Sequence, residues 1–417
     1  MIIPSVDIVR GSTVQLVGGE RQVIDAGDPR SVLDGFSLVG EVAVVDIDAA
    51  RGEGNNRELI AELCLRARIR VGGGIRSTAD ALGWLDAGAN KVIIGTAASE
   101  DLLSDLPADR VIVALDARHG EVVTHGWREG SGRDLLESVE RFRDLCGGFL
   151  VTFVEREGRM DGTDVELARQ VVDRAGEARV TIAGGITTAD EIAKLDSLGA
   201  DAQVGMALYT GRLSLADALG AMLHSDRSDG LWPTVVVDEH GIALGLAWSS
   251  LESLSQAIES RRGIYQSRSR GLWVKGETSG AVQELIGVDV DCDRDALRFT
   301  VRQSGGFCHT GTRSCWGEDR GLGRLGRRLE VIAKRRPDGS NTVRLLDEPD
   351  LLTAKLGEEL AEFLEPDADI AAEAADLLYF TLVRSIAAGV SVADIGSILD
   401  RREGRVSRRP MAAREVE

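Results

Sequence analysis

The sequence predicts an α/β protein that begins with a (β/α)8 barrel built as a half-barrel repeat. A small β-rich α+β metal domain and an all-α helical domain follow. Two observations predict the barrel: apolar, strand-like segments alternate with helix-like segments over residues 1–223, and one set of motifs occurs twice. The strands are expected at 2–6, 42–45, 92–94, 111–115, 149–154, 180–182 and 202–205, with one more apolar run ending at Val71.

The repeated motifs keep one order and one spacing. Asp7 and Asp116, Gly73 and Gly184, and Gly95 and Gly205 are 109 to 111 residues apart. Three landmarks at a common spacing indicate an internal duplication, which suits a barrel with four strands in each half.

The glycine-rich members of the repeat, 71–77 and 182–187, each follow a strand and precede a helix. This arrangement places backbone N–H groups where they can hold phosphate oxygens. The alternative is that the glycines only permit tight turns, and the matched pair favours phosphate binding.

Asp7 and Asp116 lie at the ends of symmetry-related strands, where a barrel has its active site. Two carboxylates at that face suit general acid and general base catalysis. The alternative is that each aspartate caps the following helix.

Length and composition limit the class of protein. A chain of 417 residues with 43% hydrophobic residues predicts two or three globular domains. A net charge of −19 argues against nucleic-acid and membrane partners, and the absence of a leader or a long apolar run predicts a cytoplasmic location. The five cysteines do not form a disulfide framework, and Cys64 and Cys146 are expected to be buried.

The middle domain is expected to start near Gly230, after a polar linker, with a hairpin from 235–237 and 242–248 and further strands at 263–266 and 297–301. Asp291, Asp293 and Asp295 alternate, which would place three carboxylates on one side of an extended segment as a Mg²⁺ site. Three thiols, Cys292, Cys308 and Cys315, predict a Zn²⁺ site with an open fourth position. The alternative is a structural zinc with His309 as the fourth ligand.

The third domain carries acidic residues at helical spacing. Glu358 and Glu362 share one helix face with Glu359 beside them, and Glu373 and Asp376 are three residues apart on the next helix. Carboxylates from two facing helices predict a second Mg²⁺ site, although such residues are often only a solvated face. Leu378, Leu382 and Ile386 form a stripe expected to pack against other helices.

The barrel motifs, which include 4–8, 72–77, 92–97, 116–120, 125–127 and 205–209, resemble the ProFAR isomerase family of histidine biosynthesis. The paralogous cyclase barrel shares the phosphate motifs but fits less well at 126–127 and 207–209. The resemblance implies an Amadori rearrangement with Asp7 as base, Asp116 as acid and Thr152 as a positioning residue. It implies phosphate or substrate contacts from Gly73, Gly74, Arg76, Gly95 and Thr96 in one half and from Gly184, Gly185, Gly205 and Met206 in the other. One departure is Glu157, where the family usually has Asp.

Residues 230–318, with the motifs 267–270 and 273–280, resemble phosphoribosyl-AMP cyclohydrolase. The resemblance implies that a zinc-activated water opens the adenine ring, with His309 as proton shuttle or as a residue that orients a ligand. Arg268, Arg270, Lys275 and Glu277 would contact the substrate. The family builds its zinc site across a dimer interface.

Residues 329–409 resemble phosphoribosyl-ATP pyrophosphohydrolase, an all-α family that assembles as dimers and uses a metal to release pyrophosphate. Arg344 and Lys355 would contact phosphate. Phe380 stands where many relatives have His, a departure expected to change packing only.

Together these resemblances predict a trifunctional enzyme with domains at 1–225, 226–318 and 319–417, acting on small phosphoribosyl substrates and forming a homodimer through the second and third domains. Two alternatives stay open: a barrel without catalysis, or a barrel that also isomerises phosphoribosyl-anthranilate.

Overall fold

The chain divides into two compact units. The computed structural model describes residues 1–407 except 125, 128, 268 and 270. The first unit comprises Met1–Val237, Gly245–Gly305 and the segment from Gly404, and the second comprises Asp238–Leu244 and Gly306–Glu403. The barrel and most of the β-rich region therefore fall in the first unit.

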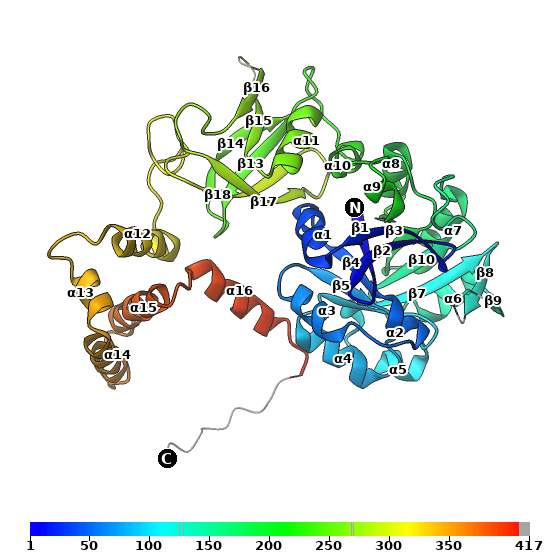
Figure 1. The fold of residues 1–417 in the computed structure, drawn as a ribbon, viewed down its shortest axis with the longest axis horizontal. Helices are drawn as coiled ribbons and strands as arrows, with labels where there is room; N and C mark the ends of the chain where they lie inside the picture. The colour runs from blue at the N-terminus through cyan, green and yellow to red at the C-terminus, as the bar shows by residue number, and fades with distance from the viewer. Residues whose placement is uncertain (125, 128, 268, 270, 408–417) are drawn as a thin grey trace. The chain divides into compact units, whose positions relative to one another are not determined.

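Eight parallel strands form a closed barrel, as the sequence predicted (Figure 1). Their order is β10-β11-β12-β1-β4-β5-β6-β7, and pairing of β7 with β10 closes the ring. The strands are β1 (Ile2–Val9), β4 (Val42–Asp46), β5 (Ile69–Gly72), β6 (Lys91–Ile94), β7 (Val111–Arg118), β10 (Gly148–Phe153), β11 (Arg179–Ala183) and β12 (Asp201–Val204). Nearly all of their side chains are buried, because helices cover the outside and side chains fill the inside.

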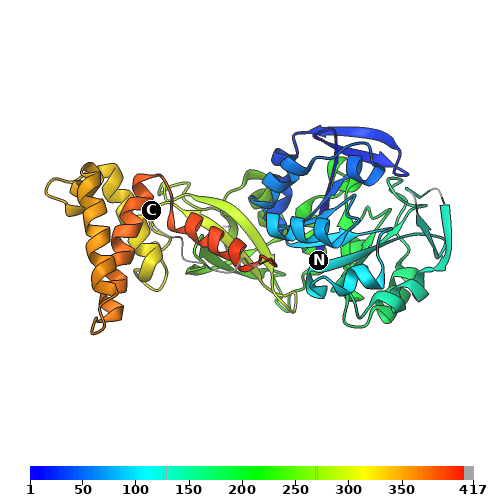
Figure 2. The same ribbon diagram turned by 90° about the horizontal axis from the view of Figure 1, so that it is seen from below.

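Helices surround the barrel (Figure 2). They are α1 (Pro29–Phe36), α2 (Ile47–Arg51), α3 (Arg57–Cys64), α4 (Thr78–Ala87), α5 (Glu100–Ser104), α6 (Leu135–Phe142), α7 (Val165–Ala175), α8 (Ala189–Ser197), α9 (Met206–Tyr209) and α10 (Leu215–Met222), with 3-10 turns η1 (Ser37–Val39) and η2 (Ala108–Arg110). The symmetry-related helices α4 and α8 begin alike: Ser77 and Thr188 each accept a hydrogen bond from a backbone N–H in the first turn. Cys64 and Cys146 are buried, as expected.

Two antiparallel hairpins extend the barrel and were not predicted. Strands β2 (Ser12–Val17) and β3 (Arg21–Gly27) follow β1, and β8 (Glu121–Thr124) and β9 (Glu129–Asp134) follow β7. Strands β1 and β7 each have eight residues, with Asp7 and Asp116 sixth in their strand. The structure thus repeats the duplication seen in the sequence.

The β-rich region is a four-stranded sheet in the order β14-β13-β18-β17 with a two-stranded β15-β16 sheet beside it. Its elements are β13 (Trp232–Asp238), β14 (Ala243–Ser249), α11 (Leu251–Ser260), β15 (Ile264–Ser267), β16 (Gly271–Val274), β17 (Gln283–Val290) and β18 (Leu297–Gln303). The predicted hairpin and both predicted strands are present.

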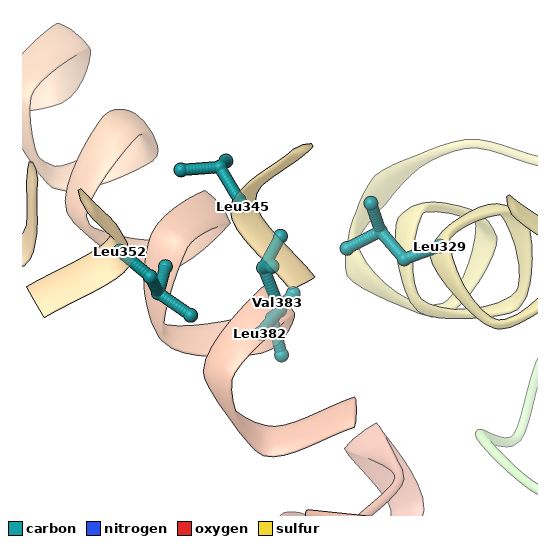
Figure 3. Close-up of a cluster of buried hydrophobic side chains, with 5 residues drawn as sticks. All are labelled: Leu329, Leu345, Leu352, Leu382 and Val383. Atoms are coloured by element: carbon teal, nitrogen blue, oxygen red, sulfur yellow. The ribbon is translucent and has the colours of Figure 1, made fainter. Parts of the chain in front are cut away.

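The second unit is mainly helical. Its helices are α12 (Gly321–Arg335), α13 (Asn341–Asp347), α14 (Pro349–Phe363), α15 (Ile370–Ala387) and α16 (Val392–Glu403). The core consists of Leu329, Leu345, Leu352, Leu382 and Val383, which converge from four of these helices (Figure 3).

The expected leucine stripe on α15 is only partly correct. Leu382 is in this core and Ile386 packs against it, but Leu378 is 43% exposed. No single helix among the described residues is long and apolar enough to cross a membrane; the bent pair α15 and α16 passes that test by length and composition alone.

Candidate active site

The barrel contains a cavity of about 1060 Å³ at the end where its parallel strands finish. Every barrel residue that the sequence predicted for the site lines this cavity. These are Asp7, Gly73, Gly74, Arg76, Gly95, Thr96, Asp116, Thr152, Gly184, Gly185, Gly205 and Met206. The two halves of the repeat therefore contribute to one site.

The symmetry-related aspartates have raised pKa values. Burial raises the pKa of Asp7 to about 6, although a hydrogen bond from Ser5 Oγ to Asp7 Oδ1, 3.0 Å long, opposes the change. Burial also raises the pKa of Asp116, and hydrogen bonds with Trp127 and Thr152 oppose it. Thr152 is beside Asp116 because it is the register partner of Asp116 in the β7–β10 pair.

Glu157 is a third carboxyl group in the cavity. Its pKa rises to about 8, first because of burial and then because of the negative charges of Asp7 and Asp116. The sequence marked Glu157 only as a departure from the family pattern. Its coupling to both aspartates depends on the loop after β10, which sequence periodicity does not describe.

The two glycine turns have matching backbone conformations. Gly73 and Gly184, which follow β5 and β11, have φ of 93° and 97°. A Cβ at Gly73 would overlap the Asp46 carbonyl, and one at Gly184 would lie 2.6 Å from the Phe153 carbonyl oxygen. Both positions therefore need glycine, and both turns lead into helix N-termini that favour anions.

Arg76 distinguishes the first turn from the second. Its Nη2 donates to the carbonyl oxygens of Ala49 and Ala50, 3.3 and 3.1 Å away, so the loop around α2 holds the guanidinium. A smaller pocket of about 420 Å³ adjoins this turn, and there the Arg57 guanidinium lies 4.9 Å from the centre of the Trp84 ring.

The acidic motif of the β-rich region lies in a turn, so the predicted extended segment is wrong. Val290 and Leu297 pair across the β17–β18 hairpin, and the chain reverses between them. The carboxylates of Asp291, Asp293 and Asp295 nevertheless have oxygen atoms within 4.8 Å of one another. The turn achieves this because Asp291 Oδ1 accepts hydrogen bonds from the backbone N–H groups of Asp295 and Ala296.

The thiols predicted to bind zinc are divided between the units. Cys292 is in the first unit, and Cys308 and Cys315 are in the second. Hydrogen bonds from Thr310 lower the pKa of Cys308 to about 6, and the hydroxyl lies 3.1 Å from the sulfur. A thiol that ionises this readily has the donor chemistry that zinc requires. His309 Nδ1 lies 3.7 Å from the Cys308 sulfur.

The loop that carries Cys308 and Cys315 is fixed by a buried ion cluster. Arg313 Nη2 and Arg327 Nη1 lie 3.1 and 3.2 Å from Oδ2 of the buried Asp238.

Of the predicted substrate contacts, Lys275 is buried near Trp273, and Glu277 follows in the next turn. Arg268 and Arg270 lie outside the described residues.

Only some of the acidic residues predicted to bind magnesium in the helical unit lie close together. Carboxylate oxygens of Glu359, Glu362 and Glu373 lie within 4.8 Å of one another, between α14 and α15. Burial and the neighbouring carboxylates raise the pKa of Glu373. Glu358 and Asp376 are not members of this group.

The predicted phosphate contacts of this unit are paired within the chain. Lys355 Nζ bridges Glu358 and Glu359 at 2.8 and 3.1 Å, and Arg344 pairs with Glu348. Phe380 packs against the helical core and contacts the Tyr379 ring, in line with a packing role.

Three family models match successive parts of the chain. The model described as "Histidine biosynthesis protein" matches residues 1–214, more than half of the chain. The chain belongs to the histidine biosynthesis protein family. Models for phosphoribosyl-AMP cyclohydrolase and phosphoribosyl-ATP pyrophosphohydrolase match residues 245–317 and 322–403. This member of the histidine biosynthesis family is therefore a fusion of three family regions.

Curated relatives also have names from histidine biosynthesis or its chemistry. The chain is 38% identical over 353 residues to a histidine biosynthesis trifunctional protein of Neurospora crassa, covering 80% of this chain and 37% of the relative. It is 32% identical over 405 residues to the Candida albicans trifunctional protein, covering 93% and 45%. An isomerase of Halobacterium salinarum, named for a phosphoribosyl imidazole carboxamide substrate, is 39% identical over 234 residues, covering 53% of this chain and 96% of the isomerase. The chain spans less than half the length of the trifunctional relatives.

Proposed function

We propose that the chain catalyses three consecutive steps of histidine biosynthesis. The helical unit hydrolyses phosphoribosyl-ATP to phosphoribosyl-AMP and pyrophosphate, the β-rich region opens the adenine ring, and the barrel isomerises the resulting aminoaldose, ProFAR, to an aminoketose. The reactions then run opposite to the order of the regions in the chain. One observation carries the isomerase assignment: both glycine turns and both aspartates line one cavity.

In the barrel, the two glycine turns would hold the phosphates at the two ends of the substrate. Asp7, with a pKa of about 6, is ionised at neutral pH and can take the proton from C2 of the sugar. Asp116 would protonate the ring oxygen, with Thr152 holding its carboxyl group.

Glu157 is a second candidate for the acid. Its pKa of about 8 keeps it protonated at neutral pH, which is the state a proton donor needs. Burial is the main cause of this raised pKa, and the negative charges of Asp7 and Asp116 add to it.

In the β-rich region, Cys292, Cys308 and Cys315 would hold zinc and Asp291, Asp293 and Asp295 would hold magnesium. A bound zinc ion supplies a water of lowered pKa. The proposed homodimer would allow this site to be shared between two copies of the chain. His309, beside Cys308, would move a proton or orient a ligand.

In the helical unit, Glu359, Glu362 and Glu373 would hold magnesium, which neutralises phosphate charge. Glu358 would act mainly by pairing with Lys355, and Asp376 by adding negative charge near Glu373. Lys355 lies next to this group and can reach phosphate oxygens, and Arg344 would contribute from α13.

The isomerase assignment is tested with Asp7→Asn and Asp116→Asn in the full chain. We expect the isomerase rate to fall roughly 100- to 10,000-fold while ring opening, measured in the same preparations, stays constant. Unchanged isomerase rates in both variants would overturn the assignment of these aspartates, and no isomerase activity in the wild type would favour a barrel without catalysis. Supplying the wild type with phosphoribosyl-anthranilate tests the broader substrate range.

A further inference from the structure

The β17–β18 turn is attached to the barrel by Arg294. Its Nε and Nη2 lie 3.1 and 3.0 Å from Oδ2 and Oδ1 of Asp196, near the C-terminal end of α8. Its Nη1 also donates to the carbonyl oxygen of Asp291, 3.1 Å away. A single guanidinium thus joins a barrel helix to the first residue of the acidic turn.

This ion pair differs from ordinary surface pairs in burial and geometry. The side chains of Arg294 and Asp196 are 21% and 14% exposed, and the contact is two-pronged. The neighbouring pair Arg298–Asp289, within the same hairpin, is 58% and 45% exposed. Two-pronged, partly buried pairs hold geometry better than exposed pairs.

The backbone at this point is also constrained. Arg294 has a φ of 65°, in the left-handed region, and its carbonyl oxygen accepts a hydrogen bond from the N–H of His224 in the linker. A non-glycine residue keeps this conformation only where its surroundings hold it. The linker, α8 and the turn therefore meet at Arg294.

A second contact joins the barrel to the β-rich region. Helix α10, which packs against α8, comes so close to α11 that a Cβ at Gly220 would lie 2.7 Å from Leu251 Cδ1. Two contacts therefore join the barrel to the β-rich region.

We propose that Arg294 and Asp196 are positioning residues through which the barrel holds the three carboxylates of the acidic turn together. This inference rests on the proposed function, because it assumes that Asp291, Asp293 and Asp295 bind a divalent cation. Three like charges within 4.8 Å repel one another, and the contact from Arg294 Nη1 to the Asp291 carbonyl adds a support from outside the turn to the hydrogen bonds within it. Removing that support weakens cation binding without removing any ligand.

The test is Mn²⁺ binding to the full chain, followed by electron paramagnetic resonance. A background with Glu362→Gln and Glu373→Gln silences the helical cluster. In that background we expect Arg294→Gln to weaken Mn²⁺ binding roughly 10- to 100-fold, as is usual for residues that support ligands. Arg298→Gln is the matched control and should bind as the parent does.

Two further variants separate the outcomes. Asp293→Asn removes a ligand; if it leaves Mn²⁺ binding unchanged, no cation binds at the turn, and both the proposed cation site and this inference are wrong. If Asp293→Asn weakens binding but Arg294→Gln does not, only the positioning role is wrong. Isomerase kcat/KM should stay unchanged in every variant. Thermal unfolding checks that each variant is folded. Arg294→Lys keeps the positive charge but loses the two-pronged contact with Asp196, so its Mn²⁺ affinity should lie between those of Arg294→Gln and the parent.

Discussion

Three carboxyl groups in the barrel cavity all have raised pKa values, but each has different neighbours. Asp7 gains a hydrogen bond from Ser5, Asp116 is hydrogen-bonded with Trp127 and Thr152, and Glu157 experiences the charges of both. Separation of pKa values among neighbouring acids is how one site holds a base and an acid at the same pH.

We predict a bell-shaped pH profile for isomerase kcat/KM. Activity rises through pH 6 as Asp7 loses its proton and falls above pH 8 as Glu157 loses its own. Glu157→Gln should remove the fall above pH 8 and reduce the rate roughly 100-fold or more if Glu157 is the acid. Glu157→Asp is the control and should keep a fall in kcat/KM at high pH. A Gln variant with the wild-type profile would leave Asp116 as the acid.

The residues of the barrel site were largely predictable from the sequence because their motifs are local. A glycine pair after a strand or an aspartate at a strand end can be read from a few neighbours, and all of them line the cavity. Glu157 could not be assigned a role, since its pKa depends on Asp7, 150 residues away in the chain. In the helical unit, spacing alone paired Glu358 with Glu362, whereas packing of α14 on α15 places Glu359 in the group instead.

At the scale of elements, the eight barrel strands were predictable because they are apolar, but the two hairpins were not. Strand β3 is mostly exposed, and β9 (Glu129–Asp134) contains no large apolar residue, so neither shows a strand pattern. Residues 321–328, which are rich in glycine and arginine, form the start of α12. Gly326 is accommodated there because a Cβ would lie 2.6 Å from Val392 Cγ2 of α16.

We predict that Gly184→Ala weakens both the β11–α8 turn and substrate binding. The added Cβ would meet the Phe153 carbonyl and the residue would keep a φ of 97°, at a cost of roughly 1 to 3 kcal/mol. The measurements are chemical unfolding and the isomerase KM. Gly199→Ala, another positive-φ glycine with open space around its Cβ, controls for backbone strain alone. Equal KM changes in the two variants would contradict a role for Gly184 in phosphate binding.

We predict that Cys308→Ser loses zinc and ring opening together. The thiol of Cys308 ionises near pH 6, whereas a serine hydroxyl stays protonated and is a poor zinc ligand. Metal analysis of the purified chain measures the loss. Cys64→Ser, at a buried position whose thiol pKa is raised to about 12, serves as the control and should retain zinc. Full zinc content in Cys308→Ser would exclude this thiol from the site.

At the scale of the whole molecule, the three family regions would place the three proposed reactions on one chain. Each proposed product is the substrate of the region that precedes it in sequence. The regions nevertheless use separate residues, so a defect in one need not affect the chemistry of another.

We predict that Glu362→Gln blocks only the first of the three proposed reactions. With phosphoribosyl-ATP as substrate, release of pyrophosphate and formation of the aminoketose should both fall roughly 100-fold, because the helical carboxylate group loses a ligand. With the aminoaldose supplied directly, the isomerase rate should equal that of the wild type. Glu365→Gln, which changes an acidic residue outside the group, is the control. A slow isomerase in Glu362→Gln would indicate that the regions are coupled.

The near-symmetry of the barrel creates an ambiguity of orientation. Under the proposed function, a substrate with a phosphate at each end could enter a cavity with two similar turns in either direction, and only one direction would bring its C2 proton to Asp7. Reversed binding occupies the site without reaction, which lowers kcat and KM by the same factor. Arg76 occurs at the first turn only, since Thr187 takes its place at the second, and under the proposed function Arg76 would favour one direction of binding over the other.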